Sequence, residues 1–423
     1  MSGANQRAAR GDGAAAAKPA PGVVGGGVEP TRIGELLARY PDKFGDLLED
    51  PAGYRMQVLV GVQEHLGVME RWGYRVDAEY FYPASTVKLC TALAASHVLW
   101  QLQEAEIAVS RVSPFVVHPL RDGEREFVYE IPPTHARDKK MRNRAGTFDG
   151  IGRDIRRSLL VSDNPAANRL YEIVGHDALN RLMWRAGLTT VRFNHRLSDF
   201  RTPDQQRRTA RVDFYAGDEL THSIPERVSQ LREDNATFGG LAGLLAGKAY
   251  VDPETGVRVD RPMDFTGKNR IGLMDLQHLI GMMLPAAKAD LRPPEVDAVD
   301  AANLINATCD LPRQCPDLHF DRTEHTDERY KWYLPGLKRL RGGSAVTICN
   351  KIGRAYGFST DTAMIFPLRP PKTPRPTLFL AATLFTCRGG VLNNDAYEYE
   401  RADRFFADLG EVVAREFWGL RGR

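Results

Sequence analysis

Three short groups of polar residues carry side chains that could form and cleave an acyl-serine bond. Ser85 and Lys88 stand three positions apart in Ser-Thr-Val-Lys, so on a helix the hydroxyl and the amine would share one face. A serine hydroxyl is a weak nucleophile until a neighbour takes its proton. An amine in apolar surroundings has a lowered pKa, so Lys88 could accept that proton near neutral pH. The pair predicts a nucleophile at Ser85.

Ser162-Asp163-Asn164 and Lys351-Ile352-Gly353 form the other two groups. Each group also has a simpler interpretation. Ser, Asp and Asn before a proline are common at the start of a helix, and a lysine on a strand is unremarkable. The S-x-x-K spacing also occurs by chance, and Lys88 could extend to the surface. Each group is therefore weak when it is taken alone.

The segment around Ser85 predicts a buried helix. Lys88 is the only formally charged residue between Tyr80 and Gln103, and Pro83 precedes the segment. A helix that is apolar on almost all sides belongs in a core. We therefore expect a long buried helix from about residue 85 to residue 104, with its N–H groups available to an oxyanion near Ser85.

The remaining elements are expected on both sides of a helical middle. Apolar spacing predicts one amphipathic helix from Thr31 that ends by Pro51, and further helices over residues 165–174, 273–284 and 397–417. Five strands are expected at residues 56–62, 68–74, 345–351, 362–366 and 377–386. Residues 202–265 and 290–340 are rich in Pro, Arg and Asp and are predicted to be long loops or insertions.

This order of elements predicts an α/β (α+β) protein with a five-stranded antiparallel sheet flanked by helices, and an all-helical lobe inserted into it. We expect residues 1–30, rich in Gly, Ala and Pro, to be disordered, and residues 31–423 to form one catalytic domain. Its α/β lobe would comprise residues 31–84 and 341–423, and its helical lobe residues 85–340. The cleft between the lobes is the expected site.

Composition excludes several other classes of protein. The 423 residues carry 57 basic and 54 acidic side chains, a net charge of +3, which does not indicate a nucleic-acid partner. A basic run from Arg137 to Arg144 is interpreted as a solvated loop. No apolar run approaches the length of a membrane span, and the first residues do not resemble a secretory signal.

Cysteine and histidine spacing gives little sign of a metal site. The five cysteines form no C-x-x-C pair; Cys309 and Cys315 either close a small disulfide loop or stay as free thiols. His319, Asp321 and His325 lack the spacing of a known metal site and are interpreted as a surface loop. We expect neither a metal nor a cofactor.

Taken together and in this order, the three groups resemble the class A serine β-lactamases and the penicillin-binding proteins. The similarity continues over residues 81–88, 162–168 and 351–367, which follow the family's nucleophile segment, second motif and K-T-G strand pair. It covers most of residues 31–423 apart from the insertions. The resemblance favours an extracytoplasmic location, whereas the lack of a recognisable signal argues the other way, so the compartment is left open.

The resemblance implies a role for each matching residue. Ser85 would be acylated, Lys88 would help to deprotonate it, and Ser162 would pass a proton to the leaving nitrogen. Asn164 would orient Lys88 and the substrate amide. Lys351 would attract a substrate carboxylate, and the backbone N–H groups of Ser85 and Arg354, which follows Gly353, would form the oxyanion hole. The expected substrate is a small molecule or peptide with a carboxylate.

Two positions depart from the family pattern. Ile352 stands where a hydroxyl residue is usual, which removes one hydrogen bond to a carboxylate. The stretch from His195 to Asp204 contains no glutamate, although class A enzymes use a glutamate there to hydrolyse the acyl-enzyme. Asp199 or Asp204 could substitute for it. The alternatives to β-lactam hydrolysis are therefore a D,D-peptidase, transpeptidase or esterase with slow deacylation, or a binding protein that keeps the fold without catalysis.

Overall fold

The computed structural model describes residues 30–64, 68–129, 150–216, 218–231, 244–283, 291, 293–315, 321, 323–369 and 374–423. Three predictions concern residues that lie wholly or largely outside these ranges. These are the disordered segment at 1–30, the basic run from Arg137 to Arg144, and the position of His319 in the histidine-rich loop. Nothing in the described residues bears on them.

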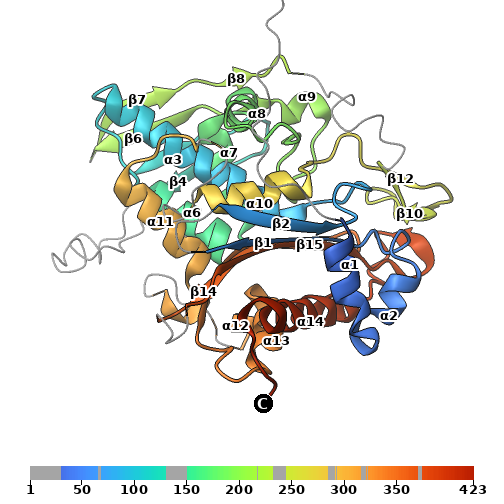
Figure 1. Ribbon diagram of the computed structural model, residues 1–423. Coiled ribbons are helices and arrows are strands. Elements are labelled where there is room, and N and C mark those ends of the chain that lie inside the picture. The colour runs from blue at the N-terminus through green and yellow to red at the C-terminus, as the bar shows by residue number, and fades with distance from the viewer. Residues whose placement is uncertain are drawn as a thin grey trace, which may run out of the picture.

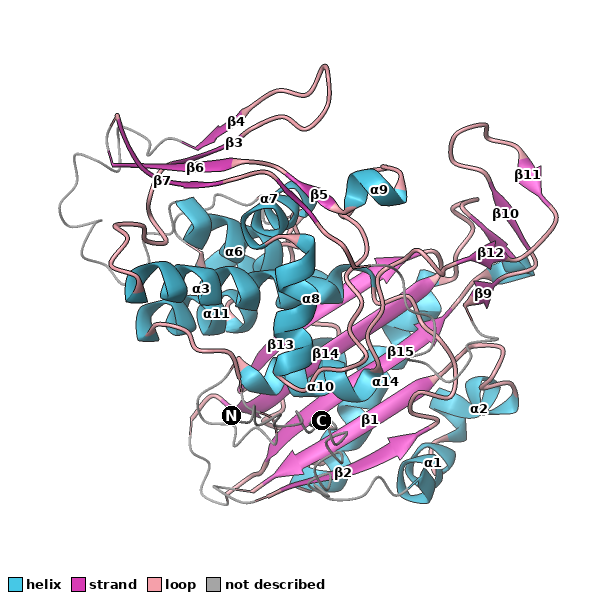
Figure 2. Ribbon diagram, turned by 90° about the horizontal axis from the view of Figure 1, so that it is seen from above, coloured by secondary structure: helices cyan, strands magenta, loops and turns pink. Residues whose placement is uncertain are grey.

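A five-stranded antiparallel sheet forms the centre of the molecule, and this confirms the predicted fold class (Figure 2). Its strand order is β13-β14-β15-β1-β2, so the three C-terminal strands lie side by side and the two N-terminal strands extend the sheet next to β15. The strands are β1 (Gln57–Gln63), β2 (Met69–Tyr74), β13 (Val346–Ala355), β14 (Phe358–Pro367) and β15 (Thr377–Phe385). β1 pairs with β15 from Gln57 opposite Thr383 to Gln63 opposite Thr377, which joins the two ends of the chain.

Both faces of this sheet are buried. On β1, Val58 and Val60 belong to the core on one face, whereas Leu59 belongs to the core on the other. Successive side chains of a strand point to opposite faces, so a run of apolar residues is expected where helices cover both sides. Figure 1 shows α1 (Pro30–Ala38) and α14 (Tyr399–Trp418) on one side, and α10 (Leu273–Met282) with the second lobe on the other.

The single amphipathic helix expected up to Pro51 is two helices, α1 and α2 (Pro41–Glu49). Pro41 lacks an N–H group and disfavours helical geometry in the residue before it. Tyr40 accordingly has φ −125° and ψ 65°, outside the helical region. Both helices still bury their apolar faces against the sheet, with Leu37 and Phe44 at 0% exposure.

The second lobe has a helical core built from segments far apart in the chain. Its helices are η1 (Ala84–Val87), α3 (Lys88–Glu104), α6 (Gly150–Leu160), α7 (Asn164–Val174), α8 (His176–Arg185), α9 (Pro203–Gln206) and α11 (Ala298–Cys309). The expected helix at 165–174 is confirmed in α7: the Asp163 carboxylate accepts from the Ala166 N–H, and Gly175 with φ 88° ends the helix.

This lobe is not all-helical, contrary to expectation. A four-stranded sheet in the order β4-β3-β6-β7 covers it, formed by β3 (Phe115–Val117), β4 (Phe127–Tyr129), β6 (Val212–Ala216) and β7 (Glu219–Ile224). The polar composition of residues 202–265 concealed short alternating patterns. Phe214 and Phe115, both at 0% exposure, pack with ring centroids 6.1 Å apart, and this contact anchors the sheet.

The rest of the two predicted loop regions also contains regular structure. Short strands lie at β5 (Arg208–Thr209), β8 (Arg227–Val228), β9 (Leu245–Ala246), β10 (Ala249–Val251), β11 (Arg258–Val259), β12 (Met263–Asp264) and β16 (Val391–Leu392). Residues 290–340 include α11, η3 (Pro312–Gln314), α12 (Asp327–Tyr330) and α13 (Leu334–Lys338), and η4 (Arg388–Gly390) follows β15. The division of the chain into lobes at residues 84 and 340 stays a prediction.

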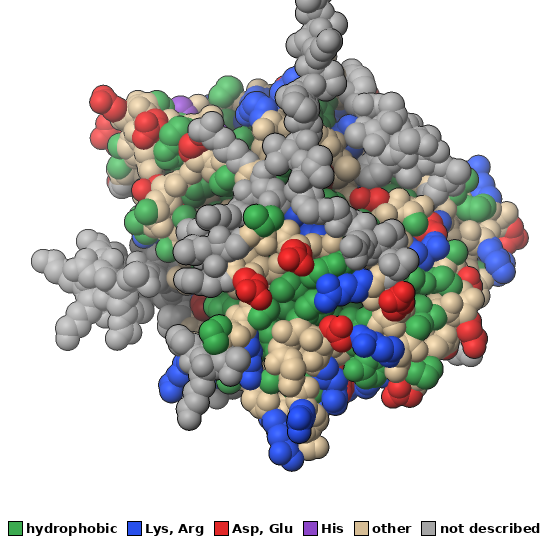
Figure 3. Space-filling view, in the orientation of Figure 1, with side chains coloured by type: hydrophobic (Ala, Val, Ile, Leu, Met, Phe, Trp, Pro, Cys, Tyr) green, Lys and Arg blue, Asp and Glu red, His purple; other side chains and the backbone are tan. Residues whose placement is uncertain are grey.

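On the face shown in Figure 3, the described residues form no patch of a single charge that would favour a charged partner. Blue and red side chains are interspersed there among apolar and neutral ones. The chain as a whole carries a net charge of only +3, in agreement with this mixture. Within the described residues, no helix is both long and apolar enough to cross a membrane.

Candidate active site

Ser85 lies in a tight turn at the edge of the second lobe. It belongs to the four-residue 3-10 helix η1 rather than to the first turn of the α-helix that was expected, because α3 begins at Lys88. Ala84, directly before it, has φ 47°, a left-handed conformation that is unfavourable for alanine. Ser85 is half-buried and lines a cavity, whereas Lys88 is fully buried.

The edge strand β13 passes very close to this turn, and Gly353 makes the approach possible. A Cβ atom at Gly353 would lie 2.3 Å from the Pro83 carbonyl oxygen and 2.9 Å from the Ser85 nitrogen. Any other residue would therefore push the strand away from the turn. The structure thus places the backbone of β13 beside the Ser85 N–H, where the predicted oxyanion hole with Arg354 requires it.

Lys88 connects the first two predicted groups. Its Nζ donates to Asn164 Oδ1 at 2.6 Å, to Ser162 Oγ at 3.2 Å and to the Ser162 carbonyl. Burial holds the pKa of Lys88 well below its ordinary value, and the neighbouring Lys351 lowers it further, while Asp163 raises it. Among the described residues no hydrogen bond joins Lys88 Nζ to Ser85 Oγ. Lys88 thus contacts the expected partner Asn164, and Ser162 in addition, but not Ser85.

Lys351 approaches Ser162 from the opposite side. Its Nζ donates to Ser162 Oγ at 2.9 Å and to the Ile352 carbonyl at 2.9 Å, and its side chain is 1% exposed. Burial lowers the pKa of Lys351 to about 7; the carboxylate of Asp361 raises it, and the Lys331 ammonium group lowers it. Lys351 can therefore change its charge near neutral pH.

Helix α7 positions the loop that faces Ser85. Asn164 Nδ2 donates to Ser198 Oγ at 2.7 Å. Asn168 exchanges two hydrogen bonds with Leu197: its Nδ2 donates to the carbonyl at 3.0 Å and its Oδ1 accepts from the N–H at 2.8 Å. The motif that contacts Lys88 is thereby linked to the loop between His195 and Asp204.

The two candidate deacylation residues lie in different surroundings. Asp199 lines the cavity that contains Ser85, and its carboxylate is paired with Arg201 at 2.8 Å. Asp204 is 88% exposed and paired with Arg207 at the start of α9. Asp204 is not among the residues that line the cavity. Of the two, Asp199 therefore has the better position, but an arginine holds its carboxylate.

The cavity beside Ser85 has a volume of about 590 Å³. Its wall includes Ser85, Asn164 and the predicted oxyanion residue Arg354. Residues of the first predicted insertion and of the segment after it contribute to this wall as well, among them Leu231, Glu254 and Lys268. Such a volume accommodates a small molecule of drug size.

The side chain of Arg354 points away from the predicted oxyanion position. Its guanidinium group pairs with Asp403, donates to Ser359 Oγ at 3.0 Å and stacks over Trp332 at 4.4 Å. Only the backbone of Arg354 is therefore available to the reaction. This agrees with the backbone function that the resemblance implies for this position.

Two buried charges near Lys351 were missed in the sequence. Asp361, on β14, is fully buried and accepts from Asn350 Nδ2 at 3.0 Å; burial raises its pKa to about 7. Lys331, 3% exposed, donates to the Thr308 carbonyl at 2.6 Å, and burial lowers its pKa to about 8. In the sequence, Asp361 was detectable because an aspartate directly precedes the apolar strand pattern at 362–366. Nothing in the sequence distinguished Lys331 from the other lysines.

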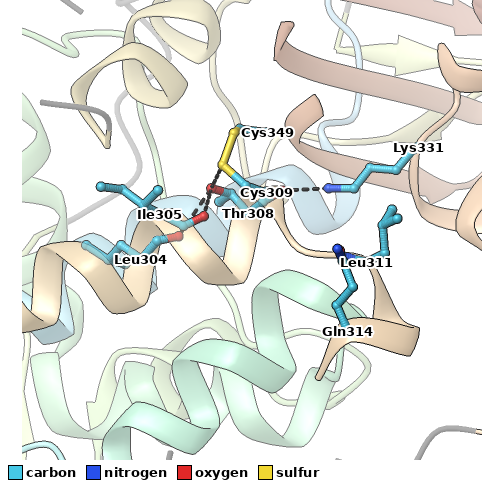
Figure 4. Close-up of a disulfide and its surroundings, with 8 residues drawn as sticks. All are labelled: Leu304, Ile305, Thr308, Cys309, Leu311, Gln314, Lys331 and Cys349. Atoms are coloured by element: carbon cyan, nitrogen blue, oxygen red, sulfur yellow. Dashed lines mark hydrogen bonds between the residues drawn. A yellow bond between two sulfur atoms is a disulfide. The ribbon is translucent and has the colours of Figure 1, made fainter. Parts of the chain in front are cut away.

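The possible Cys309–Cys315 disulfide is contradicted, and the free-thiol alternative holds for Cys315 alone. Cys309 is bonded to Cys349 on β13 (Figure 4), and Cys315 is a buried free thiol. The last turn of α11 lies against β13, which brings Cys309 to that strand, while Cys315 accepts from Arg156 Nε at 2.8 Å. The disulfide adjoins Thr308, whose carbonyl binds Lys331, so it fixes the surroundings of the buried charges.

A metal site is not indicated. In the described part of the chain, no three His, Cys, Asp or Glu residues are grouped so that they could hold an ion. Of the candidate histidine cluster, His325 bonds to the hydroxyl of Tyr330 through Nδ1 at 2.6 Å and stacks on that ring. The expectation of a reaction without metal or cofactor stays a prediction.

The fold and the site define a mixed α/β protein in which a serine lines a cavity and two buried lysines meet at Ser162 behind it. The model of a family described as "Beta-lactamase enzyme family" matches residues 153–217, which include Ser162, Asn164 and the loop of Asp199. The predicted relationship to the serine β-lactamases is thereby confirmed for this segment. No curated protein matches the chain.

Solved class A β-lactamases align with most of the chain. A variant of the reconstructed enzyme of the last common ancestor of Gram-negative bacteria is 17% identical, with 93% of this chain and 99% of that chain covered and a TM-score of 0.43. A putative class A enzyme, PenP, from Rhodopseudomonas palustris is 18% identical (90% and 98% covered, TM-score 0.44). The β-lactamase of Streptomyces albus G is 15% identical (90% and 99% covered, TM-score 0.44).

The family match and the site together support a serine hydrolase of the β-lactamase type.

Proposed function

We propose that this protein is a serine hydrolase that cleaves amide or ester bonds through an acyl-enzyme, and that β-lactams are among its substrates. One observation carries the proposal: Ser162 Oγ lies within hydrogen-bond distance of both Lys88 and Lys351, beside the turn that presents Ser85 to a cavity. Two buried amines around one hydroxyl form a proton path next to a nucleophile.

The proposed acylation step uses Lys88 as the base. Ser85 Oγ attacks the carbonyl carbon and loses its proton to the neutral amine of Lys88, whose lowered pKa makes that form available. The proton then passes through Ser162 to the leaving nitrogen as the amide bond breaks. The negative charge on the carbonyl oxygen is met by the N–H groups of Ser85 and Arg354. Because Lys88 Nζ bonds to Ser162 and Asn164, a small rotation toward Ser85 must precede proton transfer.

Substrate recognition is proposed to begin with Lys351. When protonated, this ammonium group attracts a carboxylate of the substrate, and Gly353 lets the edge of β13 lie beside the Ser85 turn. Ile352 offers no hydroxyl, so the carboxylate receives one hydrogen bond fewer than in the family pattern. We expect weaker binding of the carboxylate as a result, by about 1 kcal/mol.

A second candidate function is acyl transfer or peptidase chemistry with slow deacylation. The observation that favours it is the pairing of Asp199 with Arg201 at 2.8 Å. The Arg201 guanidinium group occupies a carboxylate oxygen of Asp199 and leaves fewer lone pairs free to accept a proton from water. Asp199 is therefore proposed as an inefficient deacylation base, and a long-lived acyl-enzyme is expected.

Intact-protein mass spectrometry after mixing with benzylpenicillin separates these proposals. An adduct on Ser85 that disappears within the mixing time indicates a β-lactamase, and one that persists indicates slow deacylation. If Asp199 is the base, Asp199→Asn prolongs the adduct, whereas the matched exposed control Asp204→Asn does not. Equal lifetimes in both variants would exclude Asp199.

A further inference from the structure

The cavity beside Ser85 extends along an aromatic wall that the acylation step does not use. Tyr82 and Tyr356 meet edge to face with ring centroids 5.2 Å apart, and His195 stacks on Tyr82 at 6.4 Å. Burial lowers the pKa of His195 to about 4, so its imidazole is neutral at physiological pH. All three residues line the cavity. The wall is therefore apolar and uncharged next to the nucleophile.

The charged residues around this cavity are mostly basic. Arg196, Arg201, Arg207, Lys268 and Arg354 line it, against Asp199 and Glu254. The four arginines already have carboxylate partners, which are Glu172, Asp199, Asp204 and Asp403. Pairing cancels most of their attraction for an anionic ligand. Their presence alone therefore does not define a binding site.

Lys268 is different, because no carboxylate of the described residues lies within ion-pair distance of it. Its Nζ lies 5.5 Å from the centroid of the Tyr356 ring. Its charge also acts on His195, since it is one of the causes that lower the pKa of that imidazole. An unpaired ammonium group thus stands at the edge of the aromatic wall. A cation over an aromatic ring is held in position yet can still bind an anion.

We infer that Lys268 and the Tyr82–Tyr356 wall form a subsite for an aromatic or apolar acyl group that carries a second carboxylate. The inference rests on the proposed function and adds the substrate class to it. The first carboxylate would meet Lys351, whose Nζ lies beside Ser162 Oγ, and the second would meet Lys268, which lines the cavity. Glu254 also lines the cavity, and its carboxylate has no ion-pair partner among the described residues. It repels a dianionic ligand only where the ligand comes close to this carboxylate.

Benzylpenicillin and carbenicillin provide a matched pair of probes, because carbenicillin has one additional carboxylate on the acyl side chain. The rate of adduct formation on Ser85 is measured for both compounds by rapid mixing and quenching, followed by intact-protein mass spectrometry. The second-order acylation rate constant of the unaltered protein is expected to be about tenfold higher for carbenicillin at low salt. The preference should weaken at high ionic strength, since the subsite is partly exposed to solvent.

The variants isolate the charge of Lys268. Lys268→Met should remove the preference while the rate with benzylpenicillin changes little, and Lys268→Arg should retain it. Lys248→Met, at an exposed lysine that does not line the cavity, is the matched control and should keep the full preference. Equal rates for the two penicillins, or a preference that survives Lys268→Met, would overturn the inference while the proposed function stands. A protein that neither forms an adduct with nor consumes either penicillin would overturn the proposed function and the inference with it.

Discussion

Lys88 and Lys351 meet at one oxygen atom: Ser162 Oγ lies 3.2 Å from the Nζ of Lys88 and 2.9 Å from the Nζ of Lys351. Both amines are buried, at 0% and 1% exposure. Two protonated amines in such surroundings repel each other and lack hydration, and this explains why burial and mutual charge lower the pKa of Lys88. The arrangement favours one neutral and one charged amine around a hydroxyl that can pass a proton between them.

Replacement of Lys88 by methionine should leave the fold intact and slow acylation. The methionine side chain fills most of the same buried space but cannot accept a proton from Ser85. General-base contributions are about 100-fold to 10,000-fold, so the acylation rate constant should fall by at least 100-fold. Lys88→Arg should not restore the rate, because a guanidinium group keeps its proton. A fall of less than tenfold with Lys88→Met would show that another group deprotonates Ser85.

Acylation by penicillins should decline as the pH rises through about 7. In that range Lys351 loses the charge that attracts the substrate carboxylate, because burial lowers its pKa to about 7. Asp361 raises that pKa and Lys331 lowers it. Asp361→Asn should therefore move the alkaline limb of the acylation profile to lower pH, and Lys331→Met should move it to higher pH.

The opposite directions of these two shifts serve as the internal control. A general loss of stability would lower the rate in both variants without moving the limb, and thermal unfolding of each variant would reveal it. Shifts in the same direction would contradict the assignment of the limb to Lys351.

Gly353→Ala should damage both the fold and the site. The added methyl group would lie 2.3 Å from the Pro83 carbonyl oxygen, so either β13 or the Ser85 turn has to move. Inserting an extra carbon into a packed region destabilises a protein by about 1 to 3 kcal/mol. Chemical unfolding would measure that change.

The matched control for this variant is Gly342→Ala, near the start of β13, where a Cβ atom meets nothing within 4 Å although φ is 75°. Gly342 has the positive φ that Gly353 lacks, so this control reports the cost of backbone strain at an open position, without a steric clash. Gly353→Ala should lose acylation and Gly342→Ala should retain it. Normal acylation in Gly353→Ala would show that β13 need not lie so close to Ser85.

Reduction of the disulfide should destabilise the protein and disturb Lys351 indirectly. The Cys309–Cys349 bond closes a loop with a sequence separation of 40 residues. Loss of such a crosslink is expected to cost about 2 to 4 kcal/mol. The comparison of thermal unfolding with and without reductant, in the unaltered protein and in Cys309→Ser, measures it, with Cys387→Ser as the free-thiol control. Peptide mapping without reduction should recover Cys309 linked to Cys349; a Cys309–Cys315 peptide would contradict the structure.

The site motifs were recognisable in the sequence because each lies on a regular element whose local pattern is strong. The charge-free run around Lys88 predicted its burial, and the Asp163 cap with Gly175 marked α7 within one residue of its start. The strand pair β13 and β14 was expected from alternation and from the turn at Tyr356 and Gly357, which have φ values of 53° and 78°. Short-range rules are sufficient for such elements.

What the sequence did not predict depends on contacts between distant segments. The pairing of Cys309 with Cys349 follows from the packing of α11 against β13, and no spacing rule contains that information. The four-stranded sheet of the second lobe is held by Phe115 against Phe214, about a hundred residues apart. Lys268 is an ordinary lysine in a polar segment until the fold places it over Tyr356.

The most direct test of the central claim is the mass of the intact protein over time after mixing with benzylpenicillin, in the unaltered protein and in Ser85→Ala. The account predicts a covalent adduct equal to the mass of the penicillin in the unaltered protein, located on Ser85 by peptide mapping, and none in Ser85→Ala. An adduct that forms equally in Ser85→Ala, or an unaltered, folded protein that neither carries an adduct nor consumes the penicillin, would contradict it.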